Sequence, residues 1–144
     1  MIRPATESDL PELVAMISEL AEFENLSDQV VCSEQDLREA LFGDGAVVHD
    51  TVAVAEDGSL VGHALWFRTF STFLGTTGIW LEDLYVRPGA RRHGYASALM
   101  AHLRSRTRGR VEWEVLEWNS DAIDFYQRLG ARPMAGWTKY RWTV

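Results

Sequence analysis

The sequence has few of the residues from which disulfide frameworks, metal clusters or membrane spans are built. Cys32 is the only cysteine among 144 residues, which excludes an intrachain disulfide and a multi-cysteine metal cluster. No apolar run reaches the roughly eighteen residues of a transmembrane helix, and Met1-Ile2-Arg3-Pro4 leads into a polar helix start instead of an apolar leader. These absences predict a soluble, cytoplasmic protein.

Basic residues are also scarce: 14 Lys and Arg stand against 21 Asp and Glu, for a formal net charge of −7. This balance argues against nucleic-acid or membrane binding, because phosphate backbones and anionic lipids repel a negative protein. It favours a cationic partner. Against this background Arg87, Arg91 and Arg92 form a local basic cluster, which predicts an anionic ligand at that loop and a cationic substrate elsewhere.

The pattern of apolar residues predicts one domain spanning residues 1–144, with an α/β fold of the mixed-sheet α+β type. The expected strands are 2–5, 47–55, 60–70, 79–86, 110–116 and 137–143, and the expected helices are 6–25, 33–43, 97–103 and 119–129. The order is therefore β-α-α-β-β-β-α-β-α-β. A meander followed by a βαβ crossover predicts a sheet that is antiparallel first and parallel at strand 79–86, with helices on its faces.

Short polar motifs predict where these elements begin and turn. Thr6 with Asp9, and Ser33 with Asp36, have the spacing of helix N-terminal capping pairs. Asp57-Gly58 predicts a hairpin turn.

The strand, loop and helix from Ile79 to Leu103 predict a site for an anion. An apolar strand ends at Pro88-Gly89, and a basic, glycine-containing loop then leads into an Ala/Leu/Met-rich helix. The first N–H groups of such a helix lack acceptors and lie at its positive end, which suits a pyrophosphate. An ordinary strand-to-helix turn with a solvated basic edge is the alternative.

Arg91-x-x-Gly94-x-Ala96 on this loop resembles the acetyl-coenzyme A signature of the GNAT superfamily of N-acetyltransferases. Ile2–Thr6, Leu81–Val86 and Trp118–Tyr126, followed by Leu129-Gly130-Ala131, resemble the branch that contains the diamine (spermidine/spermine) and thialysine N-acetyltransferases. The resemblance covers the whole chain and implies the fold of that superfamily. It also implies acetyl-CoA as co-substrate and a homodimer.

The resemblance implies a set of residues for acetyl-CoA: Leu84, Tyr85, Val86, Arg91, Arg92, His93, Gly94, Tyr95, Ala96, Ser97, Asn119, Ala122 and Tyr126. The loop amides would hold the pyrophosphate, and the amides of Leu84 to Val86 would stabilise the oxyanion that forms at the thioester. Arg92 stands where relatives often have glycine, but its backbone N–H remains available.

Acetylation of an amine needs a base, because an ammonium near pKa 10.4 requires about 4 to 5 kcal/mol to become the free base at pH 7. Glu82 and Asp83 are adjacent on a strand, so we expect them to point to opposite faces and only one to serve a given site. A salt bridge or an exposed sheet face is the alternative reading of this pair. The resemblance implies Glu82 as the base and Asp83 as second candidate.

Two further roles follow from the resemblance. Tyr126 would protonate the departing thiolate, although a core aromatic on an amphipathic helix is the alternative. The implied amine pocket consists of Phe23, Glu24, Trp80, Glu82, Asp83, Glu112, Trp113, Glu114 and Trp137. Carboxylates among aromatic rings suit an alkylammonium. The four histidines show no ligand spacing, so we expect no metal.

The loop before strand 79–86 narrows the range of expected substrates. Polyamine-acetylating relatives carry an aspartate there, whereas this chain has Ser71-Thr72-Phe73, which is closer to the thialysine type. We therefore expect a smaller amine or amino acid. Three alternatives remain: a ping-pong reaction through Cys32, which lacks a recognisable base; a non-catalytic acyl-CoA-binding module; and a protein lysine or N-terminal acetyltransferase. Aromatic residues on both faces of the expected strand 137–143 predict a homodimer.

Overall fold

The computed structural model describes residues 1–144, which divide into two compact units, Met1–Glu114 and Val115–Val144. The first unit holds a five-stranded sheet with the strands in sequence order. These are β1 (Ile2–Pro4), β2 (Val48–Val54), β3 (Leu60–Ser71), β4 (Thr76–Val86) and β5 (Val111–Glu112). Pairing is antiparallel from β1 to β4 and parallel between β4 and β5. The predicted mixed sheet is confirmed.

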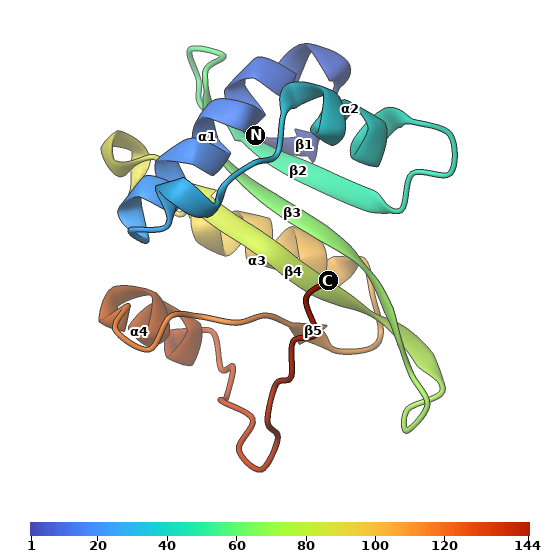
Figure 1. Ribbon diagram of the computed structural model, residues 1–144. Coiled ribbons are helices and arrows are strands. Elements are labelled where there is room, and N and C mark those ends of the chain that lie inside the picture. The colour runs from blue at the N-terminus through green and yellow to red at the C-terminus, as the bar shows by residue number, and fades with distance from the viewer. The chain divides into compact units, whose positions relative to one another are not determined.

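Helices cover both faces of this sheet (Figure 1). The helices of the first unit are α1 (Leu10–Phe23), α2 (Glu34–Phe42) and α3 (Tyr95–Ser105), with short 3-10 turns at Glu7–Asp9, Ser27–Gln29 and Pro88–Ala90. We call the side of the sheet under α1 and α2 the α1/α2 face, and the opposite side the α3 face. None of the helices is long and apolar enough to cross a membrane.

Local sequence signals position these elements as expected. The Ser33 hydroxyl accepts a hydrogen bond from the Asp36 N–H at 3.0 Å, and the Asp36 carboxylate accepts one from the Ser33 N–H at 2.9 Å, which starts α2. Gly58 has φ +87° in the turn between β2 and β3, and the Asp57 carboxylate accepts the Ser59 N–H at 3.0 Å.

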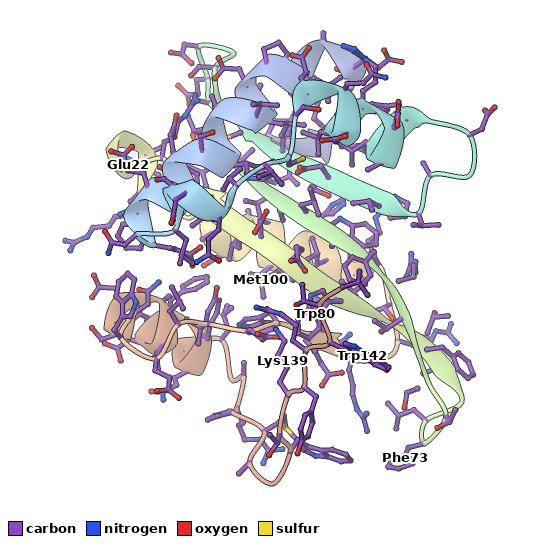
Figure 2. All side chains as sticks on the ribbon, viewed as in Figure 1. Glu22, Phe73, Trp80, Met100, Lys139 and Trp142 are labelled. Carbon is purple, nitrogen blue, oxygen red and sulfur yellow. The ribbon has the colours of Figure 1, made fainter.

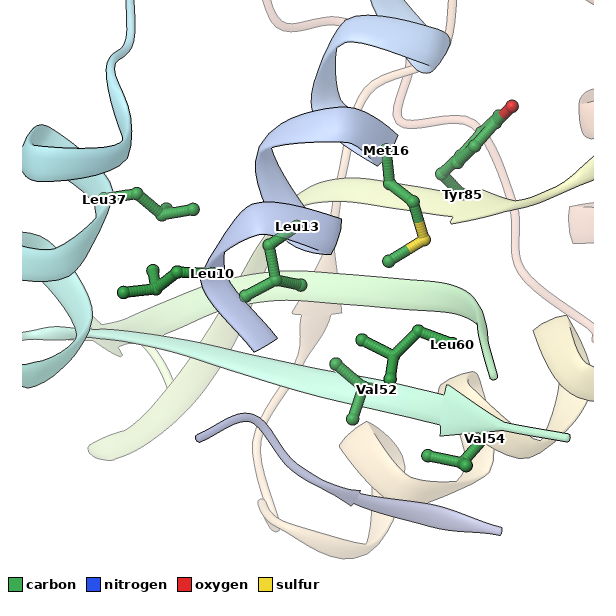
Figure 3. Packing of buried hydrophobic residues seen from close by; sticks show 8 residues of the cluster. All are labelled: Leu10, Leu13, Met16, Leu37, Val52, Val54, Leu60 and Tyr85. Atoms are coloured by element: carbon green, nitrogen blue, oxygen red, sulfur yellow. The ribbon is translucent and has the colours of Figure 1, made fainter. Parts of the chain in front are cut away.

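The main core lies on the α1/α2 face (Figure 3). It is formed by Leu10, Leu13 and Met16 from α1, Leu37 from α2, and Val52, Val54, Leu60 and Tyr85 from the sheet or its margin. On the α3 face, Leu99 and Leu103 are fully buried. Because Val52 and Tyr85 mark the α1/α2 face, residues that share their face can be read from the strand register.

A β-bulge at Glu82 interrupts the alternation of β4. Trp66 of β3 lies opposite Leu81, but Leu65 lies opposite Asp83, so Glu82 is an extra residue on β4. Beyond the bulge, Asp83 shares a face with Leu65, which packs against the α1/α2 core. Trp80, opposite Phe67, is on that same face.

The C-terminal strand expected at 137–143 does not form. The second unit contains α4 (Ser120–Arg128), and the residues after it have no regular secondary structure. Trp137, Tyr140 and Trp142 are 75%, 91% and 96% exposed; Figure 2 labels Trp142 in this segment. β5 is also shorter than the expected 110–116. Alternating residues indicate which side chains share a face, but a strand also needs a free neighbouring edge with which to pair.

Candidate active site

The open edge of β4 forms one wall of the site. β4 pairs with β5 only at Ile79 and Trp80, so within Met1–Glu114 the edge from Leu81 to Val86 has no strand partner on that side. β3 covers only the other edge of β4. The sheet therefore splays after Trp80, where β4 and β5 no longer pair.

Backbone N–H groups point into this splay. The Arg87 N–H donates to the Val61 carbonyl of β3, so alternation turns the N–H groups of Leu84 and Val86 away from β3. The Val86 carbonyl, on that same open side, accepts a hydrogen bond from Arg91 Nε at 3.0 Å. Two donors, spaced one residue apart, thus face the open edge.

The start of α3 supplies a second group of donors. The first bond of this helix runs from the Ala98 N–H to the Gly94 carbonyl, which leaves the N–H groups of Tyr95, Ala96 and Ser97 without acceptors inside the helix. Gly94, the N-cap, has φ +81°, and a Cβ placed there would meet no atom within 4 Å. An uncrowded loop backbone at the positive end of a helix fits a pyrophosphate group.

The three arginines of the basic cluster have different surroundings. Arg91 lies over the Phe23 ring, with its guanidinium carbon 5.5 Å from the ring centroid. Arg92, at φ +66°, and His93 are exposed beside it. Arg87 instead binds Glu12 at 2.7 Å and Glu19 at 3.0 Å, both on α1. Arg87 is therefore paired with two carboxylates of α1 and anchors that helix to the end of β4.

Glu82 and Asp83 lie on one face of the sheet and not on opposite faces. The bulge restores Asp83 to the α1/α2 face, and Glu82 accepts a hydrogen bond at 2.9 Å from the indole N–H of Trp80, which lies on that face. Glu82 is exposed and Asp83 is half-buried. Burial raises the pKa of Asp83, and the nearby charges of Glu82 and Asp50 add to this rise, while His63 opposes it.

The end of α1 completes an acidic and aromatic surface. Burial raises the pKa of Glu24, and the charge of Asp83 raises it further, so these two carboxyl groups interact electrostatically. Phe23, beside Glu24, contacts Arg91 of the loop before α3. We call Phe23, Glu24, Trp80, Glu82 and Asp83 the amine cluster. Carboxylates with aromatic rings are a suitable environment for an alkylammonium group.

The remaining candidates are distributed over both units. Glu112 is the partner of Trp80 in the sheet and is exposed, with Trp113 and Glu114 following it. Asn119, Ala122, Tyr126 and Trp137 belong to the second unit. There the Asn119 side chain accepts the Ala122 N–H at 3.3 Å and caps α4, which carries Tyr126. The roles assigned to these residues stay predictions.

Comparison with known proteins identifies the family. Residues 14–131 match the acetyltransferase (GNAT) family. The chain belongs to this family. It is 36% identical to the thialysine N-epsilon-acetyltransferase of Sus scrofa, over 98% of this chain and 91% of that protein. It is 26% identical to the L-ornithine N5-acetyltransferase of Arabidopsis thaliana, over 99% of this chain and 83% of that protein.

The fold comparison agrees with the family. The structure of an integron cassette protein from the mobile metagenome of V. cholerae superposes with a TM-score of 0.81 at 26% identity, covering 100% of this chain and 92% of that one. The fold is therefore GNAT-like, with a five-stranded mixed sheet flanked by helices. The protein is an acetyl-CoA-dependent N-acetyltransferase.

Cys32 is neither buried, as a core residue would be, nor reactive, as a nucleophile would be. It is exposed in the segment before α2 and is not part of the core. Partial burial of the sulfur, then the charges of Asp36 and Asp83, raise the pKa of this thiol. The neutral thiol is thus favoured at pH 7, and a weak nucleophile is the result.

The structure also reveals a buried pair that the sequence reasoning missed. His63 of β3 and Asp50 of β2 have fully buried side chains, joined by a 2.9 Å contact between Nδ1 and Oδ2. Burial lowers the pKa of His63, but the charge of Asp50 and its hydrogen bond outweigh this effect, so the net shift is upward. The sequence signal for this pair was a histidine and an aspartate, each inside an apolar strand segment.

A cavity of about 280 Å³ lies away from the amine cluster. His102 and Arg106 line it from the C-terminal end of α3, whereas the acetyl-CoA loop precedes the N-terminal end of the same helix. Trp66 and Arg68 line it from β3, with the guanidinium carbon 5.4 Å from the centre of the Trp66 ring. None of the five residues of the amine cluster lines this cavity.

Proposed function

We propose that this acetyltransferase transfers acetyl directly to the primary amine of a small cationic substrate, with a thialysine-like amino acid preferred over a polyamine. The observation that carries the proposal is the amine cluster, in which three carboxyl groups and two aromatic rings adjoin the open edge of β4. Relatives named for thialysine and ornithine acetylation support an amine of this size.

Acetyl-CoA supplies the acetyl group as a reactive thioester. The N–H groups of Tyr95, Ala96 and Ser97 would hold its pyrophosphate, with Gly94 leaving room for a close approach. The family resemblance adds Arg91, Arg92 and His93 to this site. By the same resemblance, Asn119, Ala122 and Tyr126 would contact the cofactor.

Different residues of the amine cluster would bind the amine and remove its proton. Asp83 and Glu24, half-buried, would attract the ammonium group, and Phe23 and Trp80 would pack against its alkyl chain. Glu82 is exposed and oriented by the Trp80 indole, so it can take the proton and pass it to solvent. Leu84 and Val86 would direct their N–H groups to the acyl oxygen.

The tip of the β3–β4 hairpin supports the choice of a small amine. Ser71-Thr72-Phe73 occupies this turn, and Phe73 is 82% exposed there (Figure 2). A carboxylate at this position would suit the second ammonium of a polyamine, and this chain has none.

The test is release of free thiol from acetyl-CoA over a panel of thialysine, lysine, ornithine, spermidine and a basic peptide. We expect the highest kcat/KM with thialysine or a similar amino acid and a lower value with spermidine. Thiol release only with the peptide would favour a protein acetyltransferase. Cofactor binding without thiol release for any amine would favour a non-catalytic acyl-CoA-binding module.

A further inference from the structure

The Asp50–His63 pair is unusual for a sheet interior. Nδ1 of His63 lies 2.9 and 3.2 Å from the two carboxylate oxygens of Asp50, and both side chains are fully buried. Nε2 of His63 has no hydrogen-bond partner. Burying two ionisable groups costs free energy that packed apolar residues would not cost. Packing alone therefore does not explain why the core contains this pair.

The strand register places this pair beside the amine cluster. Leu65 of β3 lies opposite Asp50 of β2 on one side and opposite Asp83 of β4 on the other. His63, two residues from Leu65, is therefore a diagonal neighbour of both aspartates on the α1/α2 face. Such diagonal neighbours are typically about 7 to 8 Å apart, close enough for their charges to interact.

We propose that His63, held by Asp50, is a positioning residue for the acetyl transfer: a buried imidazolium that keeps Asp83 ionised for the substrate's ammonium group. The proposal rests on the proposed function, because it assigns Asp83 to amine binding. His63 does not touch the substrate; it acts through the charge of Asp83.

The surroundings of Asp83 show why such a cation is needed. Burial opposes the ionised form of Asp83, and the charges of Glu82 and Asp50 oppose it further. Glu24 is a third carboxyl group whose own pKa responds to Asp83. The charge of His63 counters these effects. Without it, burial and the charges of Glu82 and Asp50 would favour a protonated Asp83 and a weaker site for a cation.

The groups around His63 favour its charged form. Asp50 on β2 and Asp83 on β4 raise the pKa of His63 against the effect of burial, and Arg87, after β4, lowers it slightly. Glu12 and Glu19 of α1 pair with Arg87 and so reduce its opposing influence. The imidazolium is therefore retained above the ordinary histidine pKa and is lost only as the pH rises through the elevated value.

The main test replaces both members of the pair, since Asp50→Asn with His63→Gln keeps a hydrogen bond and removes both charges. The carboxyl carbon of Asp83 is then titrated by ¹³C NMR. We expect its midpoint to move to higher pH than in the native protein, because His63 lies on β3, next to β4, whereas Asp50 lies one strand further away, on β2. An unchanged midpoint in the folded variant would overturn the proposal.

Kinetics of the same variant separate positioning from a structural role. We expect the KM for the amine to rise about tenfold or more below neutral pH, with a smaller change in kcat, because a charged hydrogen bond to the ammonium is lost. His49→Gln is the control, since His49 is a neighbouring β2 histidine that stacks on Trp66 toward the α3 face. A lower melting temperature with an unmoved pH profile would make the pair merely structural.

A measurement on the native protein covers the case in which the double variant does not fold. The ¹⁵N shifts of the His63 ring report its protonation directly, and we expect their titration midpoint to lie above that of an ordinary histidine. A midpoint at or below the ordinary value would refute the proposal. These NMR results need no amine, so a shifted Asp83 titration in a protein that acetylates no amine would uphold the pair's electrostatic role and reject the proposed substrate.

Discussion

Two adjacent carboxyl groups on β4 have different environments, and this difference suggests different tasks. Asp83 is half-buried and its pKa is raised by burial, whereas Glu82 is exposed and held by the Trp80 indole. A buried carboxylate attracts a cation strongly, and an exposed one exchanges protons readily with water. The environment of each residue, more than its type, therefore supports Asp83 for binding and Glu82 for deprotonation.

Glu82→Gln should lower kcat/KM for the amine by about 10² to 10⁴ at pH 7, because the amide keeps the volume and removes the base. The loss should shrink as the pH rises toward the pKa of the amine, where solvent supplies the free base. The measurement is thiol release between pH 7 and pH 10, with Glu22→Gln, an exposed carboxyl group on α1, as control. An equal loss at every pH would assign Glu82 to binding or positioning.

Tyr126→Phe tests the proton donor for the leaving thiolate. If the hydroxyl protonates the sulfur, kcat should fall by roughly 10²-fold, while CoA affinity changes little because the interaction matters mainly in the transition state. Steady-state thiol release, a binding titration and a thermal melt of the same variant would show this. A kcat within about threefold of the native value would remove Tyr126 from the mechanism.

At the scale of elements, the sequence predicted those whose signals are local. The capping pairs, the Asp57-Gly58 turn and the strand, loop and helix around Gly94 all appear where expected. The bulge at Glu82 was not predicted, because it depends on the register between β3 and β4. The last strand was predicted wrongly, since alternation describes faces and says nothing of a partner edge. The Asp50–His63 pair was missed for a similar reason, because the register between β2 and β3 brings its two residues together.

Gly94→Val should weaken CoA binding by at least tenfold, because a branched side chain both disfavours φ +81° and fills the open space in front of the loop. Isothermal titration with CoA would measure this effect. Gly75→Val is the matched control: Gly75 has φ +63° and equally open surroundings, but it lies in the β3–β4 turn. We expect similar losses of stability and a CoA affinity that falls only at Gly94. Equal affinities would contradict the pyrophosphate assignment.

At the scale of the whole molecule, we propose a homodimer of single-domain subunits. The segment after α4 leaves Trp137, Tyr140 and Trp142 in water, which is costly for side chains of this size. Light scattering at micromolar concentration should return twice the 16.3 kDa mass of the chain. Trp142→Glu should shift the mass toward the monomer. A native protein that remains monomeric would contradict the proposal, although it would leave the chemistry of the amine cluster untouched.

The bulge on β4 also indicates which residue the fold does not require. Leu81 lies opposite Trp66, and Asp83 lies opposite Leu65. Removal of Glu82 alone would therefore leave an uninterrupted ladder between β3 and β4, and the remaining side chains of β4 would stay on their present faces. A chain shortened by this one residue should therefore fold, with a melting temperature equal to or above that of the native protein, and yet lose amine acetylation. Insertion of a residue here makes the sheet less regular, and the inserted residue is the carboxylate that we assign to proton removal.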